Sequence, residues 1–169
     1  MYYRGASCRI ILSDTIHLAK EGGPQMRHTY LLKEGTWKAS GCYWDSVGDV
    51  LDAEGEVTIT HEGGLWISIS KITLESDPPE EFENFYEIIP PAEGKRLTEW
   101  TSVDPDLGTF SGVMTFLDDA IFSISNSEDG QYAGFDLLMM IDENNYINRG
   151  ALFMGDEMQS SWSMELTRK

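Results

Sequence analysis

The sequence predicts an all-β protein in which about nine or ten antiparallel strands close into an up-and-down barrel. Three observations favour this fold. Turn-forming clusters recur along the chain, runs of strand length separate them, and no stretch after Gly35 has the 3.6-residue period of a helix. The chain has 169 residues, 41% of them hydrophobic, which is enough to bury the core of one domain.

Turn-forming clusters divide the chain from Gly35 onward. They combine glycine, which adopts positive φ, with proline, aspartate and asparagine, which favour chain reversals. The clusters lie at 45–48, 62–64, 76–79, 90–94, 104–108, 118–119, 128–130, 142–145 and 155–157. The runs between them contain about 7 to 11 residues. Such short connections join antiparallel neighbours, because parallel pairs need a long crossover, usually a helix.

Alternating residue types indicate half-buried strands. In 65–70 the odd-numbered positions are Leu or Ile and the even-numbered ones are Trp or Ser. In the final run, Trp162, Met164 and Leu166 share one face. About nine or ten consecutive strands must protect their edges. A closed barrel does this completely, whereas the alternative, a two-sheet sandwich, does so only in part.

The first 25 residues differ from the rest, so we expect a leader at 1–25 followed by a single barrel domain at 26–169. Two interpretations of the leader remain open. Lys20, Glu21 and Gly22 can be encoded by a purine-rich ribosome-binding sequence just before Met26, which would make Met26 the natural start. Otherwise the leader forms a helix or strand over one end of the barrel.

The chain is strongly acidic. Its 29 acidic and 12 basic residues give a net charge of −17. A surface of this sign repels the phosphates of nucleic acids and of anionic membranes, so neither is expected as a partner. The charge fits a soluble protein or one that recruits a basic partner. No apolar run reaches the roughly 20 residues of a membrane-spanning helix, and no secretory signal is evident, so a cytoplasmic location is expected.

No catalytic, metal or cofactor signature stands out in the sequence. Cys8 and Cys42 lack the spacing of a redox or zinc motif, and His17, His28 and His61 lack that of metal ligands. There is no Gly-x-Ser-x-Gly elbow and no phosphate-binding glycine loop before a helix. The sequence therefore predicts no catalytic residue, no metal and no cofactor.

Gly35, Thr36 and Trp37 open the first predicted strand. This tripeptide resembles the Gly-x-Trp motif of the lipocalins and related barrels of the calycin superfamily. The resemblance implies that Trp37 closes one end of the barrel and packs under an arginine from the last strand, which here is Arg168. It also implies an interior that holds a small ligand. The two other short lipocalin motifs are not visible.

A barrel of this size either fills its interior with side chains or leaves a cavity for a ligand. The sequence is rich in aromatic residues and methionine, which suit an adaptable apolar pocket as well as a plain core. The residues expected to bind the ligand are Trp66, Trp100, Met139, Arg149, Phe153 and Trp162.

Arg149 is the most informative polar residue in this set. Alternation places it on the same face as Ala151 and Phe153. If this face points inward, the buried cation needs an anion, either a ligand carboxylate or Asp136 on the preceding strand. If the face points outward, Arg149 meets solvent.

The leading hypothesis is non-enzymatic binding of a small hydrophobic or amphipathic ligand inside the barrel. The alternative is an enzyme that acts on such a ligand, with His61, Tyr132 and Asp136 as its acid–base groups. A third hypothesis is a filled barrel that binds other proteins through its acidic surface. The ligand and the oligomeric state do not follow from the sequence.

Overall fold

Ten strands follow one another along the chain, and the connections between them fall at the predicted turn clusters. The computed structural model describes residues 27–169, so the expectations about the leader at 1–25 lie outside the described residues. The strands are β1 (Gly35–Asp45), β2 (Val50–Glu62), β3 (Leu65–Leu74), β4 (Glu80–Ile88), β5 (Leu97–Asp104), β6 (Gly108–Phe116), β7 (Ala120–Ser127), β8 (Tyr132–Asp142), β9 (Asn145–Met154) and β10 (Glu157–Arg168).

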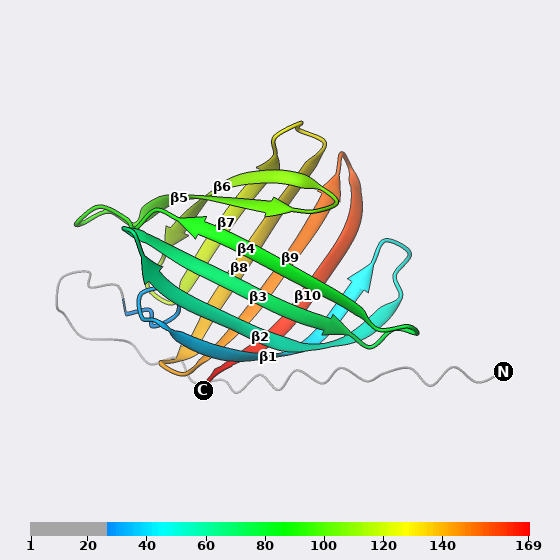
Figure 1. Cartoon of the computed structure of the whole chain (residues 1–169), viewed down its shortest axis with the longest axis horizontal. Helices are drawn as coiled ribbons and strands as arrows, with labels where there is room; N and C mark the ends of the chain where they lie inside the picture. The colour runs from blue at the N-terminus through cyan, green and yellow to red at the C-terminus, as the bar shows by residue number, and fades with distance from the viewer. Residues whose placement is uncertain (1–26) are drawn as a thin grey trace.

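Each strand pairs antiparallel with the next, and β1 pairs with β10 to close the barrel (Figure 1). No residue between 27 and 169 lies in an α-helix. The described chain therefore also has no helix of the length and hydrophobicity that a membrane-spanning segment requires. The predicted all-β, up-and-down barrel of nine or ten strands is confirmed.

Alternate side chains of each strand point into the barrel, and the register carries this alternation from strand to strand. In β8, Leu138 is buried in the core and Met140 packs against it. Phe135, on the other face of the same strand, is 38% exposed. Asp136 has the same parity as Leu138 and Met140, so its side chain points into the barrel.

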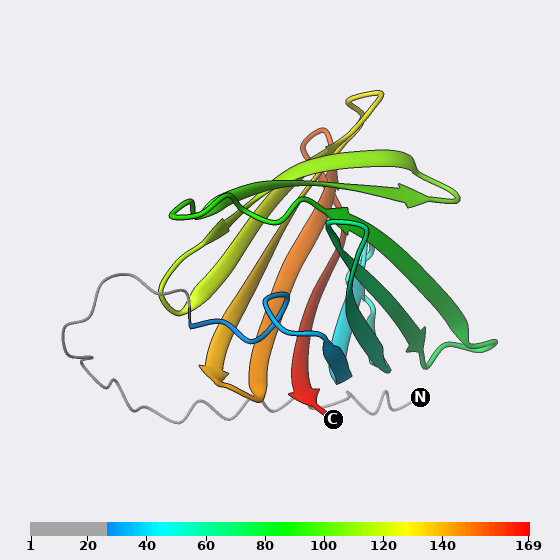
Figure 2. The same cartoon turned by 60° about the vertical axis from the view of Figure 1, so that its left-hand side comes forward.

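The segment ahead of β1, residues 27–34, lies at one end of the barrel (blue in Figure 2), and we call it the plug. Its Leu31 is buried and has a φ of 67°, a left-handed conformation that is uncommon for residues other than glycine. Trp37, Phe116 and Tyr146, which are among the largest fully buried side chains, belong to the same core cluster. The plug thus closes its end of the barrel with apolar side chains.

The opposite end of the barrel, which we call the mouth, is bounded by the loops 46–49, 75–79, 105–107, 128–131 and 155–156. Inward-facing side chains are less buried here. Phe82 is 40% exposed, and its ring stacks on that of Tyr43 with centres 6.1 Å apart. The interior is therefore sealed at the plug and more accessible at the mouth.

The pairing between β4 and β5 is the shortest in the barrel. Three residue pairs join these strands, from Tyr86–Ser102 to Ile88–Trp100. By contrast, β5 and β6 share eight pairs along their whole length. The barrel is therefore closed, but this seam contributes less backbone pairing than any other.

Candidate functional site

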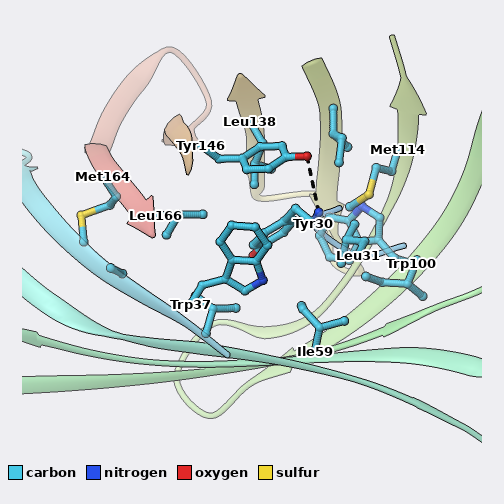
Figure 3. Packing of buried hydrophobic residues seen from close by; sticks show 14 of the residues in the cluster. Tyr30, Leu31, Trp37, Ile59, Trp100, Met114, Leu138, Tyr146, Met164 and Leu166 are labelled. Atoms are coloured by element: carbon cyan, nitrogen blue, oxygen red, sulfur yellow. Dashed lines mark hydrogen bonds between the residues drawn. The ribbon is translucent and has the colours of Figure 1, made fainter. Parts of the chain in front are cut away.

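The plug end is organised around Trp37. Its side chain is fully buried, and its ring centre lies 5.3 Å from that of Tyr30 and 5.4 Å from that of Tyr146 (Figure 3). Arg168 is opposite Trp37 in the register of β1 and β10, and its Cζ lies 5.8 Å from the centre of the indole ring. Arg168 Nη2 also donates a hydrogen bond of 2.8 Å to the carbonyl of Glu34. The structure thus contains the Trp–Arg contact that the resemblance implied.

Both histidines of the described chain are engaged in holding the plug. His28 Nε2 donates to the carbonyl of Leu117 at 2.8 Å, and His61 Nε2 donates to the carbonyl of Leu31 at 2.7 Å. A carbonyl oxygen only accepts, so both Nε2 atoms carry a hydrogen. The ring of His61 also stacks on that of Trp66. His61, one of the acid–base residues considered for an enzyme, therefore has a structural role at the closed end.

Three of the six residues expected to bind a ligand point into the barrel. Trp100 is part of the buried core, and Trp66 and Trp162 pack against that core while remaining half-buried. Trp162 lies opposite Gly150, where an added Cβ would come within 2.3 Å of its indole. The glycine therefore provides the space in which the indole lies across the inner wall.

The other three expected ligand residues, Met139, Arg149 and Phe153, point away from the interior, so the expectation that they line it is wrong. In β9, Asn148 and Gly150 face inward, and alternation turns Arg149 and Phe153 outward. Met139 is opposite the outward residue Ile147 for the same reason. Residues 27–169 provide no ion pair for Arg149, and Asp136 lies on the opposite side of the wall.

Asp136 is the polar centre of the interior. Its Oδ1 accepts one hydrogen bond from Asn148 Nδ2 at 3.1 Å and another from Trp162 Nε1 at 3.2 Å. Trp162 Nε1 also donates to Asn148 Oδ1 at 2.8 Å, which ties the three side chains together. Across β7 the residue opposite Asp136 is Ser123, whose Oγ accepts a hydrogen bond of 2.8 Å from Trp100 Nε1. Two of the inward tryptophans thus direct their N–H groups at polar atoms of one region.

The electrostatic surroundings of Asp136 favour its neutral form. Burial raises the pKa of this carboxyl group, and the hydrogen bonds from Asn148 and Trp162 offset only part of that effect. Burial also raises the pKa of Tyr30 and that of Tyr86, and the charge of Asp136 acts in the same direction on both. These three titratable groups therefore face a common interior space.

The interior around Asp136 remains partly accessible. Protein surrounds the carboxyl group closely enough to raise its pKa, yet Asp136 and Asn148 are half-buried rather than fully buried. Tyr146, the next inward residue of β9 from Asn148 toward the plug, is fully buried. On the mouth side, small inward residues follow one another across three strands: Gly112, Ser125 and Gly134.

Asn148, Ser123, Tyr30 and Tyr86 belong to this site but were not singled out by sequence reasoning. Asp136 itself could have indicated the site in the sequence. It interrupts the most apolar run of the chain and, two residues before Leu138, lies on the same face of the strand as that residue. Ser123, Asn148 and Tyr86 come from other strands, which the barrel register brings together, and Tyr30 comes from the plug. Tyr132, the third acid–base residue considered, lies nearer the mouth, with its ring centre 6.4 Å from that of Phe110.

Other sites are less developed. Residues 27–169 contain no group of three or more His, Cys, Asp or Glu side chains that could hold a metal ion. Two open grooves of about 470 and 480 Å³ lie on the outer wall, and neither includes Asp136. The first is bordered by charged residues such as Lys38 and Glu54, and the second crosses β4 to β7 past Asn126.

A solved structure of similar fold is that of the S-type phycobiliprotein lyase from Guillardia theta. The two chains superpose with a TM-score of 0.58 over 81% of this chain and 88% of the lyase, at 7% sequence identity. At this identity the likeness concerns the fold alone. No family model and no curated protein matches the sequence. The comparison supports the closed β-barrel fold.

Proposed function

We propose that the protein binds a small hydrophobic or amphipathic molecule inside its barrel without transforming it chemically. The observation that carries this proposal is the inward carboxyl group of Asp136, held at one oxygen by Asn148 and Trp162 in a partly accessible interior. A packed apolar core gains nothing from such a group, because burial disfavours its charged form and one of its oxygens stays without a hydrogen-bond partner.

The residue pattern of β3 supports the same proposal. Its isoleucines at 67 and 69 face outward, whereas Ser68 and Ser70 face the interior, as shown by the pairing of Ser68 with the buried Ile59. A barrel filled only by a hydrophobic core would favour the reverse orientation. Polar groups spread among aromatic walls are typical of sites that orient an apolar ligand.

Binding of the neutral, environment-sensitive dye Nile red tests the proposal. Ser125 points inward on β7, and Asn126 beside it points outward and lines the outer groove. Ser125→Trp fills the interior, and Asn126→Trp is the matched control that obstructs the groove. We expect saturable dye binding to the wild type, a loss of about tenfold or more in Ser125→Trp and unchanged binding in Asn126→Trp.

Circular dichroism establishes that each variant folds, and Ser125→Leu replaces Ser125→Trp if the larger side chain prevents folding. The proposal fails if the wild type shows no saturable binding. It also fails if Asn126→Trp loses the dye while the Ser125 variant retains it, because the dye would then occupy the outer wall.

An enzyme acting on the same ligand is a second candidate, because Asp136, Tyr30 and Tyr86 converge in one space. A barrel of this shape also serves as a phycobiliprotein lyase. Burial keeps the pKa of Asp136 above its ordinary value, as is useful for a general acid. Mass spectrometry of the ligand recovered after incubation distinguishes the two functions. A product formed by the wild type and not by Asp136→Asn would favour the enzyme.

A further inference from the structure

We propose that the ligand of this barrel presents a positively charged nitrogen, as in an alkylammonium group, to the free carboxylate oxygen of Asp136. This inference rests on the proposed function and adds to it the chemical class of the ligand. Three features lead to it: the free oxygen itself, the distribution of cations in the described chain, and the composition of the mouth.

One oxygen of Asp136 is left without a partner. Both hydrogen bonds to the carboxyl group, from Asn148 and from Trp162, end on Oδ1. No donor within residues 27–169 reaches Oδ2. Among those residues, every fully buried side-chain nitrogen or oxygen has a hydrogen-bond partner except Trp37 Nε1. Oδ2 of Asp136 has no partner and does not belong to this fully buried set, so it keeps some exposure through which a ligand can reach it. The fixed Oδ1 therefore orients an available acceptor within the interior.

No cation of the described chain lies inside the barrel to neutralise Asp136. Lys38, Lys71 and Arg149 project from the outer wall. The remaining described lysines and arginines belong to the plug end, in the plug itself, in the loop 89–96 and at the end of the chain. A ligand cation would supply the missing countercharge, and a charge-assisted hydrogen bond is stronger than one to a neutral donor.

The acidic loops at the mouth also favour a positively charged ligand. Each of its five loops, 46–49, 75–79, 105–107, 128–131 and 155–156, carries at least one acidic residue, and none carries a lysine or arginine. A ring of one sign attracts ligands of the opposite charge and repels those of its own. A carboxylate ligand, expected when Arg149 was placed inside the barrel, would meet repulsion both at the mouth and at Asp136.

The inference also implies that binding depends on pH. The titratable groups that face Asp136 are Tyr30 from the plug and Tyr86 from β4, while β7, β9 and β10 contribute Ser123, Asn148 and Trp162. Burial raises the pKa of both tyrosines, so they stay neutral over the range in which Asp136 ionises. Affinity for an ammonium group should therefore increase as the pH rises and Asp136 loses its proton.

Three dansyl probes of equal alkyl chain length test the inference, one ending in an ammonium group, one in a hydroxyl group and one in a carboxylate. We expect the wild type to bind the ammonium probe about tenfold more tightly than the hydroxyl probe, and the carboxylate probe most weakly. Asp136→Asn keeps the size of the side chain and removes its charge. It should lose the preference for ammonium, so that the ammonium and hydroxyl probes bind this variant about equally.

The outcomes separate this inference from the proposed function. If no probe binds saturably, or if Ser125→Trp leaves binding unchanged, the proposed function itself fails. If the hydroxyl probe binds but the ammonium probe binds no better, only the present inference fails. A preference that persists in Asp136→Asn and disappears with added salt would assign selectivity to the mouth and overturn the role of Asp136. A preference that survives salt in the wild type and weakens as the pH falls and Asp136 takes up its proton supports it.

Discussion

At the level of single residues, Arg168 and Asp136 show two opposite environments for a charge in this barrel. The guanidinium group of Arg168 lies over Trp37 and donates to a backbone carbonyl, so its surroundings are complementary. The carboxyl group of Asp136 has two donors and no counterion among residues 27–169. We therefore expect the first residue to stabilise the fold and the second to serve the ligand at some cost in stability.

Replacement of Arg168 by methionine should destabilise the protein by about 1–2 kcal/mol, because it removes the cation–π contact and the hydrogen bond to Glu34. Arg96→Met is the matched control. Its ion pair with Asp118 is largely exposed, so the loss should be about 0.5 kcal/mol or less. Urea unfolding measures both. Equal losses in the free energy of unfolding of the two variants would show that the contact of Arg168 with Trp37 adds no measurable stability.

Asp136 should make stability depend on pH in a characteristic direction. Its pKa in the folded protein is raised above the ordinary 3.8, so the folded state binds the proton more tightly than the unfolded state. Its stabilising contribution is complete below pH 3.8 and is lost as the pH rises through the folded pKa. The free energy of unfolding of the wild type should therefore fall relative to that of Asp136→Asn over this range.

Urea unfolding of both proteins from about pH 4 to about pH 7 measures this difference, and the many other carboxyl groups cancel in the comparison. A difference that does not change with pH would mean that the Asp136 pKa is the same in the folded and unfolded states.

At the level of secondary structure, the residues of the turns made the positions of the strands predictable. Which face of each strand points inward was not predictable from the sequence. Glycine, proline and aspartate have local backbone preferences, so every predicted cluster falls at a connection. The inward face depends on neighbouring strands. In β8 the outward Phe135, Leu137 and Met139 are as apolar as the inward Leu138 and Met140, so a rule that buries apolar residues cannot choose between the two faces.

The same ambiguity explains the misplacement of Arg149 and the uncertainty over Asp136. Alternation correctly grouped Arg149 with Ala151 and Phe153, but this group lies outside. The inner face of β9 instead carries Asn148 and Gly150, which look like ordinary surface residues in the sequence. The expected tryptophans at 66, 100 and 162 do point inward, but the outward Phe135 and Phe153 show that aromatic character alone does not decide the face.

The β4–β5 seam should be the first part of the barrel to open. Three residue pairs join these strands, compared with eight between β5 and β6. Local opening needs less free energy where fewer backbone hydrogen bonds and contacts must break. In native-state hydrogen exchange, the paired amides of β4 facing β5 should exchange faster than those in the centre of β9 and β10. Uniform protection around the barrel would contradict this expectation.

At the level of the whole molecule, charge is distributed unevenly along the axis of the barrel. The plug end combines acidic residues with the basic residues of the plug, the loop 89–96 and the chain end, whereas the mouth loops are acidic only. The acidic residues of the five mouth loops therefore repel one another, and no lysine or arginine in those loops offsets that repulsion.

This distribution predicts that sodium chloride stabilises the fold and that most of the effect occurs at low concentration. The Debye length shortens from about 30 Å at about 0.01 M salt to about 8 Å at about 0.15 M, so repulsion among mouth carboxylates is screened within that interval. The melting temperature should rise steeply over this range and then level off.

A matched pair of variants localises the effect. Glu128→Gln at the mouth should raise the melting temperature at low salt, and Glu93→Gln, beside Lys95 and Arg96, should not. The difference between the variants should vanish at high salt. A melting temperature that stays constant across this interval, or equal behaviour of the two variants, would show that repulsion at the mouth does not limit stability.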